Sequence, residues 1–247
     1  MNSPSTFEWD FSKQKKFIYS YSHIMTGENK MNKNSQASQR YMTEIGNLNV
    51  KVKENDLAEL SFSDIEVKMI SYDEIGNPKD TLFQNRPTNV IQGMKPDINF
   101  TNTGFDIILR MLLPLPEKSM EIGESVQVLM QMPFNANGSQ LLAKGQNTLT
   151  FTGFTEINGI NCAVLEGQLD ISNLEIPEEL DGEYSCFTKG NATYYFNIEK
   201  GYYVGVDFQM ITEFIIDTEE ENNQRDGIYM DAKNESTFKI RLEKIEE

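Results

Sequence analysis

The chain contains a single histidine, His23, which excludes metal clusters and proton relays that need several imidazoles. One histidine is still enough for the base of a nucleophilic triad. His23, however, lies in phase with Tyr19, Tyr21 and Met25 on the apolar face of an expected strand. The phosphate-binding loop, the dinucleotide-binding turn and the Gly-x-Ser-x-Gly elbow are all missing from the sequence. We therefore predict a partly buried core histidine, no catalytic residue and no enzymatic activity.

Carboxylates are abundant, so residue count alone leaves room for a pair that cleaves glycosidic bonds. The densest groups, Glu178–Glu179 and Glu219–Glu221, fall in expected loops, where such charges are ordinarily solvated. Asp217 and Asp226 flank the second group and could add oxygen ligands for calcium, but the spacing fits no defined calcium loop. We predict no metal site and no cofactor.

The two cysteines, Cys162 and Cys186, allow one pairing. They are either two inert buried thiols or, if a hairpin centred near Asn173–Leu174 places them opposite one another, a disulfide. A thiol nucleophile would need an activating base, and no neighbour in the sequence supplies one. The two structural alternatives stay open.

An aromatic cluster near residue 200 could stack on a sugar. Strict alternation places Tyr194, Phe196 and Tyr202 on the core face and leaves Tyr195 and Tyr203 outside. Two neighbouring exposed tyrosines are typical of cross-strand packing, so we expect no carbohydrate platform.

We expect a helix over residues 103–113 that packs its apolar face against the interior of the protein. Phe105, Ile108, Leu109 and Leu112 recur at helical spacing, and Pro114 prevents the helix from continuing. We expect Leu109 and Leu112 to be buried on the concave side of a sheet. Methionines add an adaptable apolar surface, with plain core filling as the alternative. The residues predicted to line a ligand are Ile108, Leu109, Leu112, Met130, Met132 and Met210.

Almost everything else alternates with period two, which predicts a mainly β protein. We expect a large curved antiparallel sheet or open half-barrel with one short central helix. A change of phase predicts a bulge near Ser63–Asp64. The other expected features are a hairpin of 7–11 with 17–25, a loop over 26–38, irregular chain over 79–102 with a short strand near Val90–Ile91, turns at 156–159, 189–191 and 199–201, and a final hairpin of 228–230 with 238–242. We expect a single domain over 1–247, with two similar halves at about 1–100 and 120–247 joined by the helix.

Three stretches carry a resemblance to known proteins: Leu113-Pro114-Leu115-Pro116, Met120–Ser125 and Thr150–Leu165. Over about Phe105–Val206 the chain resembles uncharacterised exported bacterial envelope proteins. The resemblance implies an all-β curved sheet, related in shape to periplasmic lipoprotein carriers, and it carries no active site across. The lipidated cysteine near the start of many such proteins has no counterpart here.

The formal net charge of −16 argues against nucleic acid or an anionic membrane surface as a partner. No apolar run approaches the roughly 20 residues needed to span a bilayer. The first residues lack the apolar stretch of a signal peptide. Acidic, strand-rich, Asn- and Thr-rich chains are commonly exported, so we expect a periplasmic or extracellular location after removal of a leader, with the cytoplasm as the alternative.

Together these features predict a non-enzymatic bacterial envelope or secreted binding protein. Its ligand would be a lipid, an acyl chain or another apolar molecule held between sheet and helix. The alternative is a structural or interaction module of the cell surface, with an envelope protein as partner and no small-molecule site.

Overall fold

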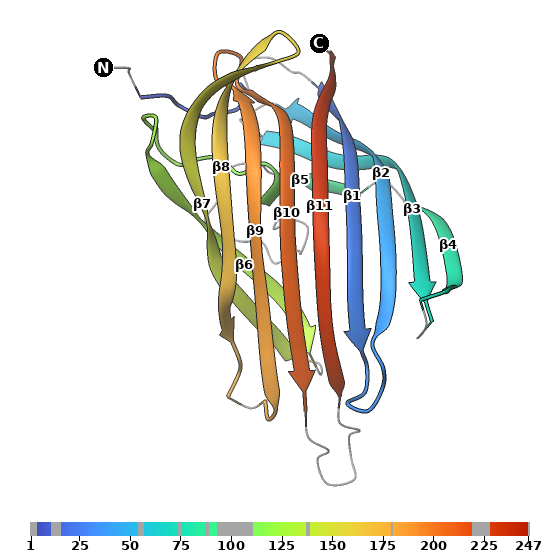
Figure 1. Ribbon diagram of the computed structural model, residues 1–247. Helices are drawn as coiled ribbons and strands as arrows, with labels where there is room; N and C mark the ends of the chain where they lie inside the picture. The colour runs from blue at the N-terminus through green and yellow to red at the C-terminus, as the bar shows by residue number, and fades with distance from the viewer. Residues whose placement is uncertain are drawn as a thin grey trace.

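The computed structural model describes residues 4–10, 16–53, 57–73, 76–86, 89–92, 111–136, 139–178, 180–218 and 228–246. Its regular structure is a series of long β-strands (Figure 1). They are β1 (Lys16–Lys30), β2 (Ser38–Lys53), β3 (Leu57–Tyr72), β4 (Pro78–Arg86), β5 (Asn89–Gln92), β6 (Ser125–Ala136), β7 (Ser139–Ile157), β8 (Ile160–Glu175), β9 (Glu183–Asn197), β10 (Tyr202–Asp217) and β11 (Tyr229–Glu246).

All of these strands belong to one 11-stranded sheet with the order β4-β3-β2-β1-β11-β10-β9-β8-β7-β6, and β5 pairs with β3 off this path. The paired strands are antiparallel, and the first strand meets the last at the β1–β11 pair. In the part of the chain that is described, β4 and β6 end the path without pairing to each other, so the curved sheet is open (Figure 1). The predicted mainly β, open antiparallel architecture is therefore confirmed.

Side-chain alternation gives the sheet two unlike faces. Along β1, Phe17, Tyr19 and Tyr21 are buried while the residues between them are partly exposed. We call this face, which carries Leu48 of β2 and Ile240 of β11, the inner face. The opposite, outer face carries mainly hydroxyl, amide and charged side chains. Such a division follows from the two-residue repeat of a strand with one wet side.

Two segments outside the strands lie on the inner face and complete the core. Residues 4–10, the N-terminal arm, place Phe7 and Trp9 there with 1% and 4% of their surface exposed. Residues 111–116, the inner segment, add Leu112 with 0% exposed. The arm is fixed to the chain after the inner segment by a backbone bridge between Ser5 and Met120. The apolar core therefore combines one sheet face with two segments far apart in sequence.

Most of the expected helix over residues 103–113 lies outside the described residues. Met111 and Leu112 have helical backbone, and the chain leaves the helical conformation at Leu113, before Pro114. This end agrees with the block that proline imposes. The predicted burial of Leu112 is confirmed, whereas Ile108 and Leu109 fall among the undescribed residues.

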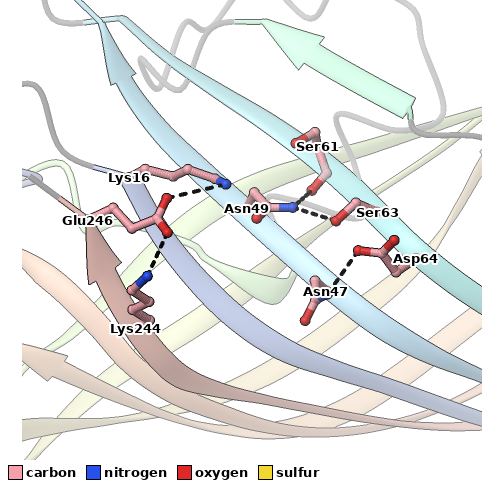
Figure 2. Close-up of polar contacts among 8 residues, drawn as sticks. All are labelled: Lys16, Asn47, Asn49, Ser61, Ser63, Asp64, Lys244 and Glu246. Atoms are coloured by element: carbon pink, nitrogen blue, oxygen red, sulfur yellow. Dashed lines mark hydrogen bonds and ion pairs between the residues drawn. The ribbon is translucent and has the colours of Figure 1, made fainter.

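The bulge predicted near Ser63–Asp64 is confirmed. The register between β2 and β3 shifts between Ile45 and Asn47, and Asp64 has a positive φ of 56°. Asn47 Nδ2 donates to Asp64 Oδ2 over 3.2 Å, as Figure 2 shows. Asparagine and aspartate tolerate the left-handed region because their short polar side chains bond locally. The bulge keeps Phe62 and then Val67 on the inner face despite the change of phase.

Figure 2 also shows how polar side chains secure the adjoining strand ends. Asn49 Nδ2 donates to Ser63 Oγ over 2.9 Å, which satisfies a side chain that is only 7% exposed. Lys16 and Lys244 both approach the Glu246 carboxylate, at 3.6 and 2.9 Å. These lysines lower the pKa of Glu246. Because the groups are exposed, their contribution to stability is small.

The expected hairpin of residues 7–11 with 17–25 is wrong. Both edges of β1 are occupied, one by β2 and the other by β11, so no further strand can pair with it. Phe7 and Trp9 alternate because they anchor the N-terminal arm in the core. The alternation of Phe7 and Trp9 therefore reflects burial of both side chains in the core, without strand pairing to β1.

Three connections predicted from polar composition are shorter than expected or absent, and the first is confined to residues 31–37 between β1 and β2. Thr26–Lys30 belongs to β1, Pro78–Arg86 forms β4, and residues 229–246 form the single strand β11 instead of a hairpin. These stretches have polar side chains because they face solvent, while their backbones remain paired with neighbouring strands. The short strand near Val90–Ile91 and the turns at 156–159 and 199–201 are confirmed.

The expected turn at Lys189-Gly190-Asn191 is instead the middle of β9. Gly190 is opposite Leu169 on β8 and Met210 on β10. A Cβ at residue 190 would lie 2.7 Å from Gln209 O and 2.8 Å from the Phe208 ring. Glycine is needed here for close approach within the sheet, which sequence reasoning mistook for a turn signal.

Candidate functional site

One transverse row of inner-face side chains crosses four neighbouring strands and is almost entirely methionine. Met25 of β1 faces Met42 of β2, Met42 faces Met69 of β3, and Met69 faces Leu82 of β4. We call these four residues the methionine row. Because directly opposed side chains lie about 5 Å apart, the row is a continuous apolar strip. Thioethers adapt their shape readily, so such a strip suits apolar surfaces of varied outline.

Exposure along the methionine row rises toward the β4 edge. Met42 is 8% exposed, Met69 36% and Leu82 50%. Nearer the other end of β2 and β3, Leu48 and Leu60 on the same face are 0% exposed. The inner face is therefore a closed core toward one end of these strands and an accessible apolar surface along the methionine row.

Three tyrosines fix the inner segment at the closed end. Tyr194 donates its hydroxyl to Met111 O over 2.6 Å, and Tyr203 donates to Pro114 O. Tyr19 donates to Tyr203 O over 3.0 Å. Burial raises the pKa of all three hydroxyls well above their usual range. Because they stay protonated, they remain donors to backbone carbonyls that would otherwise be buried without a partner.

A buried polar trio separates the closed core from the methionine row. His23 Nδ1 lies 3.2 Å from Glu44 Oε2, and His23 Nε2 lies 3.2 Å from Ser236 Oγ. Tyr21 also donates to Glu44 Oε2, over 3.4 Å. The Phe238 ring stacks on the imidazole at 4.1 Å between centroids. The predicted buried core histidine is confirmed, with polar partners from β2 and β11.

The order hydroxyl–imidazole–carboxylate of Ser236, His23 and Glu44 is also that of the triad of nucleophilic hydrolases. Ser236 lies within β11, opposite Met25 on one side and Met210 on the other. A hydrolase also needs donors aimed at a developing oxyanion, and a backbone inside two ladders has its N–H groups committed to the sheet. We therefore interpret the trio as a structural network that links β1, β2 and β11 through His23 and one carboxylate oxygen of Glu44.

The residues predicted to line a ligand have different positions. Ile108 and Leu109 lie outside the described residues. Leu112 is 0% exposed in the inner segment, and Met130 is 1% exposed on β6. Met132 and Met210 are half-buried and pack against the core from β6 and β10. Their role in ligand binding remains a prediction.

Sequence reasoning missed most of the methionine row. Alternation placed Met25 and Met69 on apolar strand faces, but it gave no register between strands. Only the pairing of β1, β2, β3 and β4 shows that these residues are neighbours. The bulge at Asp64 was the signal that could have fixed the register between β2 and β3, because the inner-face residues on both sides of it must face those of β2.

The disulfide alternative is wrong, because Cys162 and Cys186 are free and buried. The β8–β9 register pairs Ala163 with Phe196 and Ile171 with Thr188. The cysteines therefore lie at opposite ends of these strands, about eleven positions or on the order of 35 Å apart, far beyond disulfide reach. The hairpin expected at Asn173–Leu174 is displaced toward Gly182. Burial raises the pKa of both thiols to about 11, which leaves them as protonated core residues.

The predicted exposure of Tyr203 is also wrong. A bulge between Tyr203 and Gly205 shifts the β9–β10 register, so Tyr202 and Tyr203 are both buried, at 3% and 0% exposed. Tyr195 alone stays on the outer face, where the Arg241 guanidinium lies 5.9 Å from its ring centre. No paired tyrosine surface for a sugar exists at these residues.

Neither a metal centre nor a membrane helix emerges from the described ranges. No group of three or more histidine, cysteine, aspartate or glutamate side chains there is arranged to hold a metal ion. Asp217 lies 2.7 Å from Lys33 Nζ, whereas residues 219–227 are not described. Within the same ranges, none of the helical chain has the length and apolar character needed to cross a bilayer.

Hollows bordered by described residues open on the outer face. Three have volumes of about 470, 810 and 460 Å³. The largest is lined by amides in cross-strand register, including Gln168, Asn191 and Gln209. Their polar linings do not suit an apolar ligand. The methionine row therefore remains the described surface with the right chemistry for such a ligand.

Comparison with known proteins identifies no relative by sequence: no known protein family and no curated protein matches the chain. Among solved structures, one concerned with lipid–protein interactions in lipovitellin is similar, with a TM-score of 0.47 and 10% identity. The match covers 96% of this chain and 26% of the lipovitellin chain. The chain thus spans about a quarter of that protein's chain, and a similarity this weak carries no argument about function.

Proposed function

We propose that this protein is a non-enzymatic binding protein that holds an apolar ligand, such as a lipid acyl chain, on the inner face along the methionine row. The observation that carries the proposal is the rise in exposure from Met42 to Met69 and Leu82 on a face that is otherwise a packed core. Natural chains keep large apolar groups accessible in contiguous strips where something binds them. Met132 and Met210 extend the apolar face toward the β6 side.

Nile red, a neutral dye that fluoresces in apolar surroundings, tests this proposal. Met69→Gln should weaken dye binding about three- to tenfold, because it places a polar amide in the middle of the row. Ile45→Gln is the matched control, since Ile45 is 59% exposed on the outer face of the neighbouring strand. Equal binding by the two variants and the wild type would place the dye elsewhere and refute the proposal.

A second candidate function is an interaction module of the cell surface. It is favoured by exposed apolar residues on the outer face of the strands that end the sheet path, Phe83 of β4 at 71% and Leu129 of β6 at 60%. Exposed edges and apolar side chains together suit strand pairing with a partner protein. Sedimentation of Phe83→Ser and Leu129→Ser variants tests it, because loss of an assembly formed by the wild type would support this function.

The proposal includes an exported, envelope or extracellular location. Its support is the resemblance over Thr150–Leu165 and the acidic, Asn- and Thr-rich composition. Fractionation of cells that express the protein from its natural gene tests the location. Recovery with cytoplasmic markers would contradict it.

A further inference from the structure

We propose that the ligand of the methionine row is a long-chain carboxylate, whose anionic head is recognised by Arg40. This inference rests on the proposed function and specifies its substrate class. Arg40 lies on β2 two positions beyond Met42, so both side chains project from the same face. The arrangement places a cation beside an apolar strip, which is the pattern that an anionic amphiphile requires.

The Arg40 guanidinium is held in place by residues of the two strands beside β2 on one side, β1 and β11. Across β1, Gly27 lies between Arg40 of β2 and Asn234 of β11. Arg40 Nη2 donates to Asn234 Oδ1 over 3.3 Å. A Cβ at residue 27 would lie only 2.3 Å from Asn234 Oδ1 and 3.4 Å from Arg40 Nε. Glycine at this position therefore leaves the space in which the two side chains meet.

The charge of Arg40 has no carboxylate partner among the residues that the structure describes. Its hydrogen-bond partner there is the neutral amide of Asn234, and its side chain is exposed. Arg241 is different, since its Nη2 lies 2.6 Å from both carboxylate oxygens of Asp207. In a chain with a net charge of −16, an exposed guanidinium with its donors free of acid is available to an external anion.

The dimensions suit a long chain with a head at one side. The methionine row crosses four strands, or on the order of 14 Å, and Arg40 lies one side-chain row away, about 7 Å along β2. The nearest described carboxylate on the other side of Met42 is that of Glu44, which is engaged by His23 and Tyr21. Asp80 lies in the same transverse row as Arg40 but two strands away, or on the order of 10 Å. A carboxylate head at Arg40 would therefore meet the guanidinium first, while its tail lies over Met25, Met42 and Met69.

Palmitate and hexadecanol separate the head from the tail, because they share a chain length and differ in charge. By calorimetry, the wild type should bind palmitate more tightly than hexadecanol. Arg40→Gln should weaken palmitate about ten- to a hundredfold and leave hexadecanol unchanged. Lys239→Gln is the control, since it removes one positive charge from an exposed position on the outer face.

Each outcome is decisive. If palmitate and hexadecanol bind the wild type equally and Arg40→Gln changes neither, the carboxylate inference is refuted while the apolar-binding proposal stands. If the wild type binds neither compound, the proposed function itself fails. Equal weakening of palmitate by Lys239→Gln would reduce the effect to net charge and would also overturn the inference. Urea unfolding of each variant confirms that it is folded, which is expected for exposed positions.

Discussion

The hydroxyl of Tyr203 should hold the inner segment on the sheet, and Tyr203→Phe removes that single atom. The ring of Tyr203 is 0% exposed and packs against Trp9 and Phe196, at 5.8 and 4.9 Å between ring centres. Phenylalanine keeps these contacts. It leaves the buried Pro114 carbonyl without its donor.

The expected cost follows from that carbonyl. A buried acceptor that loses its partner costs about 1–3 kcal/mol, more than the net value of an ordinary hydrogen bond. For a chain of this length, the thermal midpoint should fall by roughly 2–12 °C. Leu112→Ala provides an upper reference, because a buried leucine usually costs about 2–5 kcal/mol. Tyr195→Phe is the control on the outer face and should change stability by less than about 0.5 kcal/mol.

Trp9 is the only tryptophan, and it lies in the N-terminal arm beside Tyr203. Urea unfolding followed by its fluorescence reports the arm and inner segment, while far-UV circular dichroism reports the sheet. Tyr203→Phe should lower the fluorescence midpoint at least as much as the dichroism midpoint. If it matches Tyr195→Phe by both signals, the hydroxyl does not hold Pro114 and this account of the closed end is wrong.

Three further outcomes are expected. Cys162 and Cys186 should react with Ellman's reagent only after unfolding, and the thermal midpoint should be the same with and without reductant. Fewer than two thiols titrated after unfolding in the absence of reductant would contradict their separation. Ser236 should resist fluorophosphonate labelling as completely as a Ser236→Ala variant, and a labelled Ser236 would show that the trio is catalytic. Stability should begin to fall above about pH 9, where the unfolded thiols of Cys162 and Cys186 ionise while burial holds the folded ones protonated to about pH 11. Above about pH 10 it should fall more steeply, by a further contribution of about 1.4 kcal/mol per pH unit for each of Tyr19, Tyr194 and Tyr203, because burial keeps their folded hydroxyls protonated while the unfolded ones ionise. A urea midpoint unchanged to about pH 11 would contradict both expectations.

Alternation was enough to predict the class of fold, because one wet and one buried face impose a two-residue repeat on long strands. It also located the bulge at Asp64, where the apolar phase changes within one strand. Alternation failed at Tyr203 because a second bulge, between Tyr203 and Gly205, resets the phase at the start of β10. Nothing in that stretch interrupts the apolar pattern, so the shift is visible only in the pairing.

Turn-forming composition was a poorer guide. Gly190 and Gly27 are strand residues whose missing side chains allow close neighbours, and neither ends its strand. The separation of Cys162 from Cys186 depends on where the β8–β9 connection falls, and a displacement of a few residues moves partners along the strands by twice that number. Local signals therefore identify strands better than they identify the residues opposite one another.

The candidate site could not be predicted for the same reason. Met25, Met42 and Met69 are far apart in sequence and become neighbours only through two antiparallel registers. The trio of His23, Glu44 and Ser236 likewise joins three strands, including the last one. No local pattern marks either group.

The position of the trio explains how one face can contain both a packed core and an accessible strip. Methionine side chains on a surface can change rotamer readily. In a core of apolar contacts alone, neighbouring side chains could rearrange with them. Between the two regions, His23 is fixed by hydrogen bonds on both nitrogens and by the Phe238 ring. These contacts link β1, β2 and β11 at the boundary between the two regions and restrain the three strands relative to one another. The trio thus accounts for the boundary between the packed core and the exposed methionine row.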